Sequence, residues 1–146
     1  MSSPSDRPPF LDSPAAFHEF LATWEAGALP KAAWTHAAHV AVGAAYSVRY
    51  GPGAVDELRR GIKRHNAAVG TTSTGAVGYH ETLTCFWAGV LSRVVSGSVD
   101  PWLAACHAVR LLGEERNLHR QYYSFDVVKD PDARAAFVPP DLVGPY

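Results

Sequence analysis

Residues 35–50 of the chain read THAAHVAVGAAYSVRY. Thr35 can cap the start of a helix, and the Gly51-Pro52 pair that follows the segment can end it. The pattern therefore predicts a helix over the whole segment, beginning at His36. His39 stands three residues later in the first turn, so the two imidazoles share one face of this helix.

Apolar residues recur at helical spacing on both sides of this segment, and each recurrence follows a cap or a proline. They predict further helices over residues 14–27, 54–69, 80–94 and 101–112. Beyond Gly113 the pattern weakens to a short helix near Tyr122-Tyr123 and a capped turn over residues 130–134. No internal repeat and no alternating strand pattern is visible. We therefore expect an all-α fold, an irregular bundle of about five helices with an irregular C-terminal segment.

The length of 146 residues is typical of one domain, and 47% hydrophobic residues can form a compact core. Residues 1–12 are rich in Ser, Pro, Asp and Arg, which predicts a flexible N-terminal lead. Residues 13–146 are predicted to form a single helical domain.

Composition argues against several classes of function. A net charge of -1 offers no basic stripe for nucleic acid, and no apolar stretch is long enough for a signal peptide or a membrane span. The two cysteines, Cys85 and Cys106, lie in apolar helical runs and indicate free thiols in a reducing, cytoplasmic compartment. No phosphate-binding glycine loop or nucleophile elbow is present, so no nucleotide cofactor is expected. The oligomeric state is not indicated.

Histidines are the main candidates for chemistry, with seven in the chain. His80 opens the predicted helix that follows the Gly78 turn, and the starts of two helices in a bundle can meet around one pocket. With His36 and His39 it would make a three-histidine set that can hold a catalytic divalent metal, which could be Zn, Fe, Cu or Mn. Glu81 can then move a proton or orient an imidazole. A metal-free acid/base site with the same residues stays open.

Other polar side chains in apolar settings can shape a substrate pocket around these histidines. They are Trp34, Thr35, Asn66, Tyr79, Thr82 and Tyr123. His65 and His119 lie among charged residues and are predicted to be solvated, whereas His107 reads as a core histidine.

Two segments of the chain carry a family resemblance. Residues 34–39 read WTHAAH and residues 78–82 read GYHET. They resemble a family of small, largely uncharacterised bacterial proteins with a W-T-H-x-A-H segment and a later G-Y-H-E-T segment, and the likeness extends over most of the chain. The resemblance implies a shared site formed by His36, His39, His80 and Glu81, and names no reaction. The loop before Gly78 departs from the family by lacking its Asn or Pro.

These observations predict a small-molecule enzyme with a histidine-centred, metal-dependent active site. Proton-transfer chemistry such as hydration, elimination, cyclisation or hydrolysis fits a zinc-like centre, and iron or copper would admit oxidation. The alternative is a non-catalytic helical module that binds a ligand or a partner, in which the histidines form a structural network.

Overall fold

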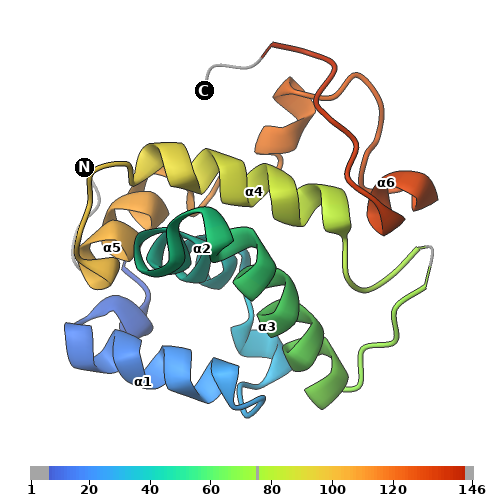
Figure 1. The fold of residues 1–146 in the computed structure, drawn as a ribbon. Coiled ribbons are helices and arrows are strands. Elements are labelled where there is room, and N and C mark those ends of the chain that lie inside the picture. Colours follow the sequence, from blue (N-terminus) through green and yellow to red (C-terminus); the bar gives the residue numbers. More distant parts are fainter. Residues whose placement is uncertain (1–6, 75, 144–146) are drawn as a thin grey trace.

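The structure is a computed structural model that describes residues 7–74 and 76–143. Within these ranges the chain is helical and contains no strand, which confirms the predicted all-α irregular bundle (Figure 1). The α-helices are α1 (Pro14–Glu25), α2 (His36–Tyr50), α3 (Ala54–Ala68), α4 (Glu81–Val94), α5 (Pro101–Leu112) and the short α6 (Pro131–Ala135). Short 3-10 turns occur at Pro9–Leu11, Lys31–Ala33, Gly51–Gly53 and Leu118–Gln121.

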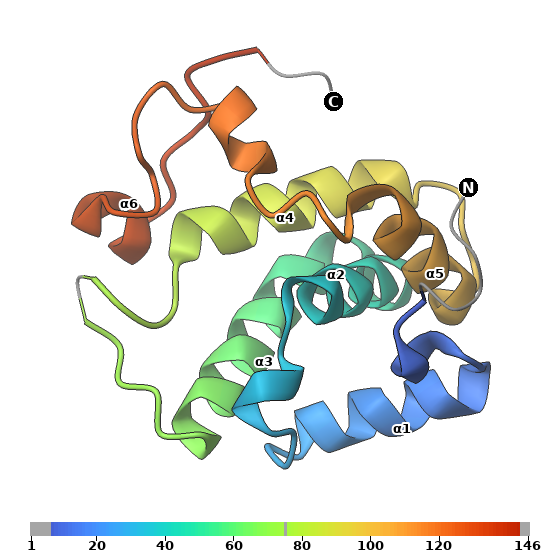
Figure 2. The same cartoon turned by 180° about the vertical axis from the view of Figure 1, so that it is seen from behind.

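Helix α2 lies at the centre of the bundle, between α1 and α4, and packs on α3, α4 and α5 (Figures 1 and 2). Residues 40–46 are all buried, because small side chains on every side of this helix let its neighbours approach closely. At Gly43 the approach is too close for a side chain: a Cβ there would lie 2.5 Å from Cδ1 of Leu91 on α4. The middle of α2 is therefore core, and its first turn carries the less buried side chains.

Side-chain caps start the helices where the sequence predicted them. Ser13 accepts a hydrogen bond from the Ala16 amide at 3.0 Å, and Thr35 accepts one from the Ala38 amide at 3.2 Å. The side chains of Asp100 and Asp130 cap α5 and α6 in the same way. Each cap satisfies an amide that the helix itself cannot pair, so the helix starts are fixed locally.

The C-terminal segment packs against α4. Thr82 is fully buried, donates to the Ala136 carbonyl and accepts from the Val138 amide, both at 3.0 Å. The Tyr123 hydroxyl donates to the Val138 carbonyl at 2.7 Å. The segment after α5 is thus part of the core, although its sequence pattern is weak.

Residues 1–12 were predicted to be a flexible N-terminal lead, but the last part of this segment is folded against the bundle. Pro9–Leu11 forms a 3-10 turn, Leu11 is fully buried, and the Phe10 ring stacks on Phe20 at 4.2 Å between centroids. Burial of the apolar Phe10 and Leu11 side chains contributes favourable free energy, which holds this segment in place although its neighbours in the sequence are prolines and polar residues. Residues 1–6 lie outside the described residues.

Two histidines predicted to be solvated are instead buried. His65 is 1% exposed and His119 is 5% exposed, whereas His107 is half-buried. The prediction for the first two was wrong because charged neighbours in sequence point to other sides of a helical turn. The described helices include none that combines the length and the apolar character needed to cross a bilayer.

Candidate functional site

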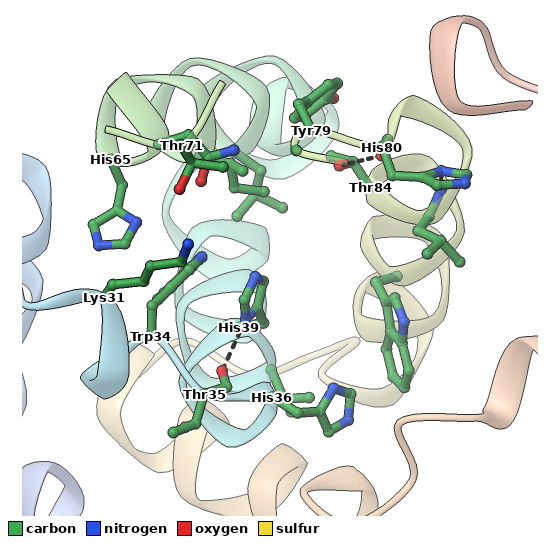
Figure 3. Close-up of a pocket in the computed structure, with 18 of the residues that line it drawn as sticks. Lys31, Trp34, Thr35, His36, His39, His65, Thr71, Tyr79, His80 and Thr84 are labelled. Carbon is green, nitrogen blue, oxygen red and sulfur yellow. Dashed lines mark hydrogen bonds between the residues drawn. The ribbon is translucent and has the colours of Figure 1, made fainter. Parts of the chain in front are cut away.

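A cavity of about 560 Å³ opens between the start of α2, the face of α3 and the start of α4 (Figure 3). Its polar lining comes from four histidines, two cations, an amide, a phenol, three threonines and two indoles. These residues are His36, His39, His65, His80, Lys31, Arg116, Asn66, Tyr79, Thr35, Thr71, Thr84, Trp34 and Trp87. The remainder of the wall is mainly aliphatic.

His39 has a fixed orientation at this cavity. Its Nδ1 lies 2.8 Å from the Thr35 carbonyl oxygen, which can only accept, so Nδ1 carries the proton and donates. The Nε2 lone pair is left available. The ring lies 3.9 Å from the Trp34 ring between centroids and remains solvent-accessible in the cavity. The surrounding protein lowers the pKa of His39 to about 4, chiefly by desolvation, so the imidazole is neutral at pH 7.

His36 repeats this arrangement with the opposite nitrogen. Its Nε2 donates to the Leu112 carbonyl at 3.1 Å, which leaves Nδ1 as an acceptor. The ring packs in a T-shaped arrangement with Trp87, at 5.0 Å between centroids. Desolvation lowers the pKa of His36, and Arg116 lowers it further. Both histidines of the α2 first turn are therefore neutral bases held by backbone carbonyls.

His80 lines the same cavity, but both of its ring nitrogens already have partners. Nδ1 accepts from the Leu83 amide at 3.1 Å, and Nε2 donates to the Val127 carbonyl at 2.7 Å. The side chain is the N-cap of α4, and Figure 3 shows its ring turned away from His36 and His39. Burial lowers the pKa of His80. Its role in the structure is to start α4 and hold the C-terminal segment.

Glu81 is not among the residues that line the cavity. Its carboxylate accepts two hydrogen bonds from Arg59, at 2.8 and 2.7 Å, and one from the Tyr79 hydroxyl at 2.6 Å. Cys85 Sγ lies 3.3 Å from the same carboxylate. The Arg59 guanidinium is the main reason that the pKa of Glu81 is lowered to about 2. A carboxylate this firmly ionised joins α3 to α4 and is a poor proton acceptor.

The structure brings together four of the six residues predicted to shape the pocket, namely Trp34, Thr35, Asn66 and Tyr79. The other two, Thr82 and Tyr123, do not line it, because their hydroxyls are hydrogen-bonded to the C-terminal segment. Of the predicted catalytic residues, His36, His39 and His80 line the cavity and Glu81 does not.

Several lining residues were not predicted from the sequence, chiefly Lys31, His65 and Arg116. His65 Nε2 donates to the Leu29 carbonyl at 3.1 Å, and its buried Nδ1 has no hydrogen-bond partner among the described residues. The ring lies 5.6 Å from Trp34. His65 falls three residues after Ile62, on the apolar face of α3, and that spacing is the signal that could have placed it inside.

A metal centre is not evident from the side-chain positions. Among the described residues, no group of three or more His, Cys, Asp or Glu side chains is placed to hold a metal ion. The three-histidine metal set therefore stays a prediction.

Comparisons with family models, with curated proteins and with solved structures find no match for this chain. The resemblance seen in residues 34–39 and 78–82 stays a prediction.

Proposed function

We propose that the protein is a small-molecule enzyme in which His39 transfers a proton within the cavity between α2, α3 and α4. One observation carries the proposal: the Nδ1–H of His39 is held by the Thr35 carbonyl, so its Nε2 lone pair is available in a cavity large enough for a small organic molecule. An oriented imidazole with a free nitrogen is the usual form of a general base in proteins.

The proton transfer needs no further reactant. Nε2 of His39 takes a proton from a C–H or O–H group of the substrate, or from water, and the ring becomes an imidazolium. The Nδ1–H keeps its hydrogen bond to Thr35, and Nε2 then returns the proton to the product. Hydration, elimination, cyclisation and hydrolysis all follow this scheme. A pKa near 4 makes His39 a weak base by itself, so a bound negative group must raise the pKa for efficient transfer.

A divalent metal ion is a second candidate for the same end of the cavity. Metal-binding histidines usually donate their other ring N–H to a carbonyl or carboxylate, and both His36 and His39 do so. Nδ1 of His36 and Nε2 of His39 could therefore hold Zn, Fe, Cu or Mn. His80 could join them only by giving up the hydrogen bond at the ring nitrogen that binds the metal, because both nitrogens have partners.

The test of proton transfer is deuterium incorporation. A panel of small carbonyl compounds is incubated in D2O with the full chain, and exchange is followed by proton NMR, with hydrolysis of small esters measured in parallel. We expect at least one compound to react, and we expect His39→Gln to abolish the reaction. His18→Gln is the matched control, because His18 is exposed on α1 and does not line the cavity. A reaction that survives in His39→Gln contradicts the proposal, and binding without any reaction favours the non-catalytic module.

The metal candidate is tested separately by elemental analysis of the purified protein. Stoichiometric metal that is lost in both His36→Ala and His39→Ala supports it, and unchanged thermal stability on adding zinc or iron contradicts it. We propose that the protein works in the cytoplasm, because Cys85 and Cys106 are both free thiols.

A further inference from the structure

We infer that the ligand of this cavity is a small organic anion, with a carboxylate or phosphate group attached to an apolar body. The inference rests on the proposed function, because it names the class of substrate on which His39 would act. Its basis is the distribution of charge around the cavity wall.

The charged side chains on the wall are all cationic. Lys31 and Arg116 line the cavity, and no Asp or Glu does so among the described residues. Figure 3 shows Lys31 reaching into the cavity beside Trp34, on the side of His39. Arg116 is close enough to His36 to oppose its protonation. A concave wall with charges of one sign concentrates ions of the opposite sign, so this wall attracts anions.

Two helix starts add to the positive potential. The first turn of α2 contributes Thr35, His36 and His39 to the wall, and the start of α4 contributes Tyr79 and His80. The amino end of a helix carries a partial positive charge from its aligned peptide dipoles. The amino-terminal turns of both helices form part of the cavity wall, so these partial charges have the same sign as the two cations.

Nearby carboxylates do not cancel this charge at the wall. Glu81 is paired with Arg59 by two hydrogen bonds and is outside the lining. Glu114 and Glu115 act on His36 through space, but they are exposed and do not line the cavity. The cations that face the ligand are therefore not matched by anions that face it.

The rest of the wall suits an apolar body. Aliphatic side chains from α2, α3 and α4 line it, namely Val40, Leu58, Ile62, Leu83 and Leu91. The Trp87 indole adds a flat aromatic surface next to His36. A ligand with a charged group near Lys31 and His39 would place its apolar part against these side chains and so remove them from water. The anion would also raise the pKa of His39 toward the range in which it transfers protons efficiently.

The experiment compares a carboxylate with its neutral amide. Phenylacetate, phenylacetamide and phenyl phosphate are titrated separately into the isotope-labelled full chain, and the indole N–H signals of Trp34 and Trp87 are followed by NMR. We expect phenylacetate or phenyl phosphate to bind about tenfold more tightly than the amide. Which of the two anions binds better distinguishes a carboxylate ligand from a phosphate ligand.

Variants of the two cationic residues test whether they cause the preference for the anion. Lys31→Gln and Arg116→Gln should each weaken binding of the anion severalfold and leave binding of the amide unchanged. Lys129→Gln is the control, because Lys129 is exposed and outside the cavity. Equal affinity for anion and amide, binding of neither probe, or no effect of Lys31→Gln and Arg116→Gln would overturn the inference. His39→Gln separates the two proposals, because it should abolish proton exchange while the anion still binds.

Discussion

Arg59 on α3 and Glu81 on α4 are joined by two hydrogen bonds, from Nε to Oε1 at 2.8 Å and from the second guanidinium nitrogen to Oε2 at 2.7 Å. Neither residue lines the cavity. Because Glu81 also accepts from Tyr79, the contact fixes the segment that leads into α4, including the His80 cap. A residue pair outside the cavity thus positions one of its edges.

Glu81→Gln should reduce the free energy of unfolding by about 1–2 kcal/mol at pH 7, because the charge-assisted bonds to partly exposed Arg59 are weakened. Since the folded-state pKa is lowered to about 2, this stabilisation is present above the ordinary value of 4.5 and is lost as pH falls toward 2. Urea unfolding at several pH values measures it. The variant should show a flatter acid dependence, whereas Glu19→Gln, at an exposed carboxylate on α1, should match the wild type. An unchanged acid slope in Glu81→Gln would contradict the assignment.

His39 should titrate far below an ordinary histidine. NMR of the ring nitrogens should show Nδ1–H as the neutral form and a midpoint near pH 4 rather than the ordinary 6.5. Because its folded-state pKa is lowered, the unfolded chain takes up the proton first, so stability should decline as pH falls from 6.5 to 4. His39→Gln removes the signal and should reduce that decline. A midpoint near 6.5 in the free protein would show that the surrounding protein does not desolvate this ring.

His80 should behave as a cap and not as a catalytic group. His80→Ala removes the acceptor for the Leu83 amide and the donor to Val127, and we expect a loss of about 1–2 kcal/mol in the free energy of unfolding. His80→Asn restores a cap acceptor and should recover part of that loss, as judged by thermal and urea unfolding. Proton exchange that disappears in both variants while they remain folded at the assay temperature would instead give His80 a direct part in the chemistry.

Gly61 on α3 should be intolerant of even one added carbon. A Cβ at this position would overlap the Trp24 indole, which is fully buried and cannot move aside. Gly61→Ala should therefore lower the free energy of unfolding by about 1–3 kcal/mol. Gly89→Ala on α4 is the matched control, because this glycine is exposed and a Cβ there meets nothing within 4 Å. Alanine at 89 should stabilise the helix by about 0.5–1 kcal/mol, so chemical denaturation should shift in opposite directions for the two variants.

Local signals in the sequence predicted most of the helices and three of the four histidines that line the cavity. Thr35 and its neighbours fix the start of α2 within a few residues, and the three-residue spacing of His36 and His39 fixes their common face. These features depend on contacts along a single helix, which a sequence displays directly.

Features that depend on contacts between residues far apart in the chain could not be predicted from the sequence. In the sequence Glu81 has no visible partner, but the fold places Arg59 of α3 beside it. His80 was predicted to be a metal ligand, but its Nε2 is hydrogen-bonded to the Val127 carbonyl. Lys31 gave no sign of its place on the cavity wall, because a lone lysine after a proline is common on protein surfaces. The positive charge of the cavity wall could be recognised only from the structure, because the fold brings Lys31 and Arg116 to the same cavity.

The group that sets the tautomer of His39 belongs to the main chain, since the acceptor is the carbonyl of Thr35. Every amino acid at position 35 would supply that same oxygen as long as the helix begins there. The walls around the imidazole can therefore be rebuilt, residue by residue, to accept a different molecule while the proton stays on Nδ1. If the cavity were altered to accept another molecule, the base that we propose would therefore keep its tautomer.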